Sequence, residues 1–151
     1  MRLARSTKPT ARAKAVACAR IADDKKAEAI TILDLRGLTY ITDYFVIATG
    51  QNPRQLGAIA EEIRSAMKKA GDRLIAEDGA EFGHWIVMDY GDFVIHLFDL
   101  EYRKIYDLEL LWGDAKRVKW QKRVRTAKVE DAPKSDGRRR GAKAAKNGDA
   151  E

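Results

Sequence analysis

Three aspartates are the residues of this sequence whose types and spacing best suit catalysis. Asp89 and Asp92 are three positions apart, and Asp43 lies at the start of a different apolar segment. Carboxylate oxygens are the ligands that Mg²⁺ prefers, so this set would suit phosphoryl or nucleotidyl transfer. The expected geometry argues against that chemistry, because Asp89 falls within a predicted strand whereas Asp92 falls in a tight turn. Aspartate is common in such turns for its backbone hydrogen bonds alone.

The other residues capable of chemistry do not form a recognisable site. His84 and His96 fall on opposite faces of a predicted hairpin, so they cannot share a ligand. Residues 50–57 contain two glycines near a helix N-terminus, which would suit an anion, but most strand-to-helix turns look similar and no P-loop lysine follows. A single cysteine, Cys18, and two histidines are too few for a zinc site. We therefore expect a binding protein and not an enzyme, with no catalytic residue, metal or cofactor.

The element that positions most of these residues is a predicted β-hairpin over residues 84–98. Two runs rich in β-branched and aromatic residues flank Gly91 and Asp92, which predicts a two-residue turn and pairs Trp85 with Phe98. Alternation of side chains then gives the hairpin two faces. The face expected to point into the core carries Ile86, Met88, Tyr90, Phe93, Ile95 and Leu97. Either a helix or a partner protein should cover the other face, which carries Trp85, Val87, Asp89, Val94, His96 and Phe98.

The segments around the hairpin predict an α/β fold with a five-stranded mixed sheet and flanking helices. Apolar residues at helical spacing predict helices over residues 12–28 and 52–71, the second with Asn52 as N-cap. After the hairpin, Asp99 should cap a further helical segment that ends at Gly113. In this segment the apolar residues expected to pack inward are Tyr102, Ile105, Tyr106, Leu108, Leu111 and Trp112. The remaining strands are expected over residues 29–35, 43–50 and 73–77.

The predicted strand over residues 43–50 differs from the others in its pattern. Its centre, residues 44–48, is a continuous apolar run rather than an alternating one. Such runs are typical of strands that are covered on both faces. We therefore expect this strand in the middle of the sheet.

Charge divides the chain into an acidic centre and two basic ends. The net charge is +6, yet residues 21–112 hold seventeen acidic and only ten basic residues. We expect a basic N-terminal tail over residues 1–11, one folded domain over 12–118 and a basic, largely disordered tail over 119–151. Such tails on an acidic domain suit a partner that offers both polyanion and basic surface, as a ribosome does. Solubility alone would also explain the tails.

A basic segment with interspersed apolar residues begins at the end of the predicted domain. This mixture suits contact with RNA, with Trp120 stacking on a base. A partly ordered extension is the alternative. The residues expected to contact RNA are Arg117, Lys119, Trp120, Lys122 and Arg123.

Composition also bears on the compartment. The sequence has no apolar run of bilayer-spanning length and no secretory signal, so no membrane contact is expected. The single cysteine is compatible with a reducing compartment. We expect a cytoplasmic bacterial protein that is a monomer or a weak homodimer. The basic, acid-free start over residues 1–20 leaves an organellar transit peptide as the alternative, although this segment runs directly into a helical pattern.

Six stretches of the sequence carry a resemblance to a known family. They are residues 32–37, 41–50, 54–55, 85–96, 106–109 and 111–115. Together they resemble the ribosomal silencing factor family, also called the Iojap family, over about residues 14–118. The resemblance implies one α/β domain that is similar in fold to nucleotidyltransferases but lacks their active site.

The resemblance also implies a function. Family members are translational repressors that bind the fourteenth protein of the large ribosomal subunit, and they sterically block joining with the small subunit when nutrients are short. On this chain the implied partner contact falls on Trp85, Asp89, Tyr90 and Asp92, and the face analysis adds His96. The alternatives are a large-subunit assembly factor and a metal-dependent nucleotidyltransferase.

Overall fold

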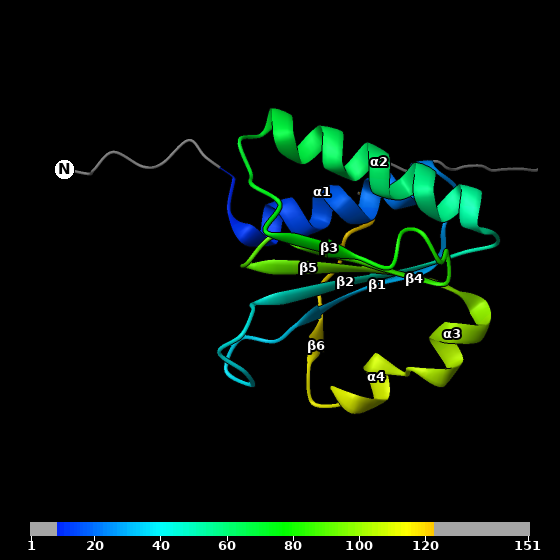
Figure 1. Ribbon diagram of the computed structural model, residues 1–151. Coiled ribbons are helices and arrows are strands. Elements are labelled where there is room, and N and C mark those ends of the chain that lie inside the picture. The colour runs from blue at the N-terminus through cyan, green and yellow to red at the C-terminus, as the bar shows by residue number, and fades with distance from the viewer. Residues whose placement is uncertain (1–8, 123–151) are drawn as a thin grey trace, which may run out of the picture. The chain divides into compact units, whose positions relative to one another are not determined.

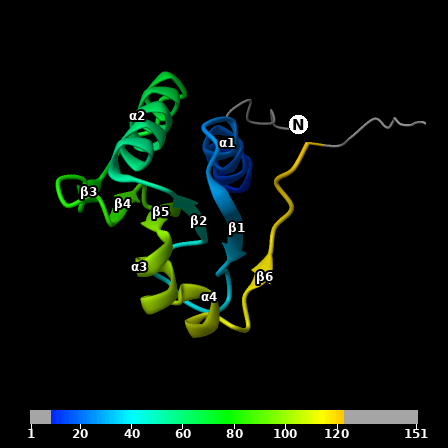
Figure 2. The same cartoon turned by 90° about the vertical axis from the view of Figure 1, so that its right-hand side faces the viewer.

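A mixed β-sheet of six strands lies between two layers of helices (Figure 1). The computed structural model describes residues 9–122. Strands β2 and β5 are parallel and the other neighbouring pairs are antiparallel, in the order β3-β4-β5-β2-β1-β6. Helices α1 and α2 cover one face of the sheet, and α3 and α4 cover the other (Figure 2). The elements are α1 (Ala11–Asp24), β1 (Glu28–Asp34), β2 (Tyr44–Gly50), α2 (Pro53–Lys69), β3 (Ala76–Asp78), β4 (Trp85–Asp89), β5 (Phe93–Asp99), α3 (Leu100–Ile105), α4 (Leu108–Leu111) and β6 (Lys116–Arg117).

The predicted hairpin forms with the expected register. Trp85 pairs with Phe98, and Asp89 pairs with Val94. The N–H of Tyr90 donates to the carbonyl of Phe93 at 3.0 Å and closes the turn. Gly91 within the turn has φ +91°, a conformation that glycine adopts without strain.

The face predicted to point inward belongs to the larger core. All six of its residues are buried with side chains from α1 and α2. The apolar stripe of α2 that packs onto this face is Leu56, Ile59, Ala60, Ile63 and Met67. Asn52 caps α2 as expected, because its Oδ1 accepts from the N–H of Gln55 at 2.8 Å. The central position predicted for the apolar strand is also confirmed, since β2 lies between β5 and β1.

The second face of the hairpin is covered by helices of this chain. Phe98 is buried there with Leu33, Leu35 and Ile47, and side chains from α3, α4 and the flanking turns pack against them. The sequence predicted that either a helix or a partner protein covers this face, and the structure shows helices there. The cover is incomplete along β4, because Trp85, Val87 and Asp89 are each only partly buried.

The sheet has six strands rather than the predicted five. The additional strand, β6, pairs with β1 through Leu33 and Arg117 and through Asp34 and Lys116. The N–H of Val118 then donates to the carbonyl of Ile32 at 2.9 Å. A strand of two basic residues has no alternation that sequence analysis could detect, and its pairing depends on the edge of β1.

Several element boundaries also differ from prediction, most of all those of α1 and β3. Helix α1 ends at Asp24 instead of continuing to Glu28, because Lys26 at φ +72° leaves the helical conformation. The third strand covers Ala76–Asp78 rather than residues 73–77. No helix among residues 9–122 has the length and apolar character needed to cross a membrane.

Candidate partner-binding surface

Helices α3 and α4 expose a group of large apolar side chains to solvent. Leu110 is the clearest case, with 78% of its surface exposed. Large exposed apolar patches are typical of interaction sites. We call this group the α3–α4 surface, and its members are Leu100, Ile105, Tyr106, Leu110 and Leu111.

Three of these residues correct the sequence prediction. Ile105, Tyr106 and Leu111 were expected to pack inward, but all three are exposed. The reason is that the chain forms two short helices with a break at Tyr106 and Asp107, so one helical period does not hold across the segment. The sequence contained no clear signal for this, because consecutive residues such as Leu110 and Leu111, about 100° apart on a helix, can also share a buried face, as Ile59 and Ala60 do in α2.

Trp85 connects the α3–α4 surface to the core. Its ring stacks on Phe98 in the core, with centroids 4.8 Å apart, and lies 4.8 Å from the ring of Tyr106. Its Nε1–H donates to Nδ1 of His96 at 3.1 Å. Trp85 is therefore held in one orientation, with one side in the core and the other beside the exposed group.

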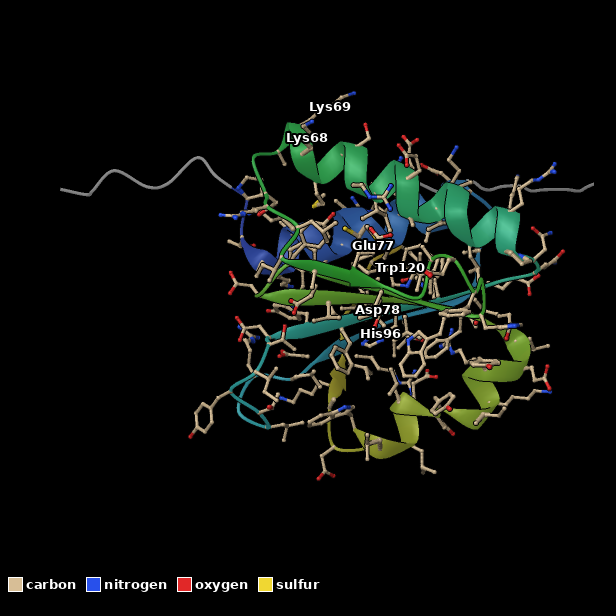
Figure 3. All side chains as sticks on the ribbon, in the orientation of Figure 1. Lys68, Lys69, Glu77, Asp78, His96 and Trp120 are labelled. Atoms are coloured by element: carbon tan, nitrogen blue, oxygen red, sulfur yellow. The ribbon has the colours of Figure 1, made fainter. Side chains whose placement is uncertain are left out.

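His96 lies beneath Trp85 and is almost completely enclosed. It lies between the sheet and the layer of α3 and α4 (Figure 3), and only 6% of it is exposed. Phe45 packs against the imidazole with ring centroids 4.4 Å apart. Burial lowers the pKa of His96 to about 4, so the ring is neutral at pH 7. Since Nδ1 accepts from Trp85, the ring proton resides on Nε2.

An ion pair between α3 and α4 fastens both helices to the sheet. Nη2 of Arg103 lies 3.0 Å from Oε1 of Glu109. Nη1 of Arg103 donates to Oγ1 of Thr49 on β2 at 2.8 Å, and Oε2 of Glu109 accepts from Thr31 on β1 at 3.2 Å. Arg117 on β6 adds a further contact to Oε2 at 3.2 Å. Five elements therefore meet at this pair.

The structure does not bring all five predicted contact residues onto one surface. Asp89, Tyr90 and Asp92 lie at the turn, whereas Trp85 lies at the opposite end of β4. Tyr90 is 8% exposed and belongs to the core under α1 and α2. A direct partner contact by Tyr90 or His96 is thus not available in this structure. Trp85, Asp89 and Asp92 remain accessible in part or whole.

Of the three residues proposed for metal chemistry, Asp89 takes part in the turn through its carboxylate, and Asp43 and Asp92 take part through their backbones. Oδ1 of Asp89 accepts from the N–H of Gly91 at 2.8 Å. The carbonyl of Asp92 accepts from the N–H groups of Asp43 and Tyr44 at 3.0 and 3.2 Å. Within residues 9–122, no three His, Cys, Asp or Glu side chains are placed to hold a metal ion.

Two further groups that could do chemistry, the start of α2 and the thiol of Cys18, also have structural roles. At the start of α2, Asn52 accepts from the N–H of Gln55, and Oε1 of Gln55 accepts from the N–H of Gln51 at 2.7 Å. These side chains therefore use N–H groups that an anion would need. Cys18 is buried, and burial raises the pKa of its thiol to about 12, so it is no nucleophile at pH 7.

The residues predicted to contact RNA are in different environments. Trp120 packs against the core on the α1 side of the sheet (Figure 3), and its Nε1–H donates to the carbonyl of Ile30 at 3.2 Å. The stacking predicted for Trp120 would require it to leave this site. Arg117 is bound to Glu109, as described above. Lys119 and Lys122 are exposed, and Arg123 lies outside the described residues.

An α/β domain that presents apolar side chains on two short helices has the features of a protein-binding module. Residues 8–149 match the family described as "Ribosomal silencing factor during starvation", and the chain belongs to this family. Family membership makes it a regulator of translation associated with the ribosome.

Individual relatives agree with the family match. A ribosomal silencing factor of Halalkalibacterium halodurans is 40% identical over 96 residues, which cover 64% of this chain and 82% of the relative. One from Bacillus subtilis is 41% identical over 93 residues, covering 62% and 79%. Among solved structures, a protein of Chromobacterium violaceum is similar with a TM-score of 0.62 and 32% identity, over 73% of this chain and 87% of that one.

Proposed function

We propose that this protein represses translation when nutrients are short, by binding the large ribosomal subunit and sterically blocking its joining with the small subunit. The observation that carries the proposal is the α3–α4 surface, which leaves apolar side chains exposed beside a firmly oriented Trp85. A regulator that acts by occlusion needs a rigid docking face and no cofactor. The proposal also places the protein in the cytoplasm, as a monomer or a weak homodimer.

The partner in this proposal is the fourteenth protein of the large subunit. Apolar side chains of the α3–α4 surface and the open side of Trp85 would form the centre of the contact. The exposed carboxylates of Glu101 on α3 and of Asp107, the N-cap of α4, suit a basic ribosomal protein, and Lys104 is the exposed base among them on α3. Asp89 and Asp92 are proposed as a separate, peripheral contact at the turn. Exposed lysines after β6, together with the basic C-terminal residues, are proposed to meet ribosomal RNA.

A subunit-joining assay tests the steric mechanism. Purified large subunits are incubated with the protein, small subunits are added, and light scattering reports the joined ribosomes. We expect the protein to reduce joining, and we expect more small subunit to overcome the block, because both compete for one face. A block that no excess of small subunit relieves would contradict occlusion. Binding to precursor particles but not to mature large subunits would instead favour the assembly-factor alternative.

A further inference from the structure

His84 forms a hydrogen-bonded pair with a carboxylate at the margin of the α3–α4 surface. Its Nδ1 lies 2.6 Å from Oδ2 of Asp99. The other oxygen of Asp99 accepts from the N–H of Tyr102 at 2.8 Å and caps α3. The imidazole stacks on the Tyr102 ring, with centroids 4.6 Å apart and planes at 7°. The ring of His84 is therefore fixed in both position and plane.

The pairing with Asp99 determines which nitrogen of His84 carries the proton. An ionised carboxylate only accepts hydrogen bonds, so Nδ1 must donate and Nε2 keeps its lone pair in the neutral ring. Within residues 9–122, the hydrogen bond of the ring is the one to Asp99, and 48% of the side chain is exposed. Neutral His84 thus offers a hydrogen-bond acceptor of fixed direction to an approaching molecule.

The surroundings of His84 indicate the kind of molecule that would use this acceptor. Leu100 of the α3–α4 surface directly follows Asp99, and the Tyr102 ring lies 5.8 Å from that of Tyr106. A polar group beside exposed apolar side chains is the usual arrangement at the rim of an interface. The exposed carboxylate of Glu101 on the first turn of α3 favours a partner with positive charge.

We propose that His84 is a specificity-determining residue of this surface, whose Nε2 accepts a hydrogen bond from an arginine, lysine or backbone N–H of a basic protein partner. Asp99 is its positioning residue. The inference rests on the proposed function, since it takes the partner to be a ribosomal protein that meets the α3–α4 surface. It predicts that protonation of His84 weakens binding, because Nε2–H then faces a donor. The titratable groups in contact with the ring are Asp99 and Tyr102.

The second histidine, His96, does not contribute to a change of binding with pH. His96 is buried, and its pKa is lowered to about 4. It therefore stays neutral over the range from pH 8 to pH 5.5. A change in binding that disappears on substitution of His84 can be assigned to that ring.

Binding to purified large subunits at pH 8, 7, 6 and 5.5 tests the proposal with three variants. His84→Phe keeps a ring against Tyr102 and loses the acceptor, so we expect binding about tenfold weaker at pH 8 and no pH response. Asp99→Asn keeps the helix cap, because asparagine caps as well as aspartate, but loses the charge that fixes the tautomer. Tyr40→Phe, on a fully exposed ring of the β1–β2 loop, is the control and should match wild type.

The ring ¹⁵N shifts of the free protein test the geometry independently of any partner. We expect Nδ1 of His84 to be protonated in wild type, and a mixture of tautomers in Asp99→Asn. Unprotonated Nδ1 in wild type would overturn the inference. So would wild-type affinity and pH response in His84→Phe, and in that case the proposed function would stand. No binding of wild type at any pH would overturn both.

Discussion

Trp85 and His96 show how far the sequence could be interpreted at the scale of single residues. Alternation along the hairpin placed both on one face, and the structure confirms this with a direct hydrogen bond between them. Alternation along the hairpin could not show that His96 is enclosed, because the enclosing side chains come from Phe45 and from helices after the hairpin. For the same reason it could not show which side of Trp85 stays open.

The buried imidazole of His96 predicts a pH dependence of stability. Its pKa falls from an ordinary 6.5 to about 4 on folding, so below pH 6.5 the unfolded chain takes up a proton that the folded chain does not. Neutral His96 therefore leaves the free energy of unfolding at its full value above pH 6.5. The free energy of unfolding then decreases as the pH falls towards 4. The loss should amount to about 3 kcal/mol.

Urea unfolding at pH 7, 5 and 4 measures this effect. Carboxylates with lowered pKa values, such as that of Asp34, also make the folded protein less stable as the pH falls. The effect of His96 is therefore measured as the difference between wild type and His96→Gln, which share these carboxylates. We expect the difference between wild type and His96→Gln to shrink by about 3 kcal/mol from pH 7 to pH 4. A difference that stays constant over this range would show that His96 does not titrate on unfolding.

At the scale of elements, the helices after the hairpin depend on tertiary contacts. Helices α3 and α4 span six and four residues, which is too short for either to be stable alone. Capping by Asp99 was predictable, but the break at Asp107 and the ion pair that holds both helices were not. Strand β6 could not be predicted from the sequence either, because its two residues form a strand only against β1.

Glu109 should therefore control the order of the α3–α4 surface. Glu109→Gln removes the charge that pairs with Arg103, whose side chain is only 11% exposed. We expect a loss of about 2 kcal/mol in the free energy of unfolding, since an enclosed guanidinium loses its partner. Amide hydrogen exchange in α3 and α4 should accelerate more than in β4 and β5. The control is Glu101→Gln, an exposed carboxylate on α3, which should stay within about 0.5 kcal/mol of wild type. Equal exchange rates in the two variants would contradict this role for Glu109.

At the scale of the whole molecule, charge separates an acidic domain from basic ends. Composition predicted this division, and it also suggested that the domain ends at Val118. Packing continues further, because Trp120 contacts the core and its carbonyl accepts from Nε of Arg20 at 2.7 Å. A basic sequence pattern could not distinguish a tryptophan that packs on its own domain from one that meets RNA.

The proposed contact between the basic C-terminal residues and RNA predicts a salt effect. Removal of residues 123–151, which keeps the Trp120 contacts, should leave binding to large subunits weaker at low salt. It should also reduce the slope of log affinity against log salt concentration, because fewer phosphates are neutralised. Titrations at several salt concentrations measure the slope. If the shortened and full-length proteins gave the same slope, these residues would have no role in RNA contact.

Docking on the large subunit through the α3–α4 surface is tested most directly by co-sedimentation with separate large and small ribosomal subunits. Trp85→Ala is a poor probe, since loss of a partly buried tryptophan also weakens the core. Leu110→Asp and Ile41→Asp alter apolar side chains that are 78% and 86% exposed, the first on the α3–α4 surface and the second on the β1–β2 loop. We predict that wild type and Ile41→Asp pellet with large subunits only, and that Leu110→Asp binds at least about tenfold more weakly. Equal binding of Leu110→Asp and wild type would contradict docking through this surface.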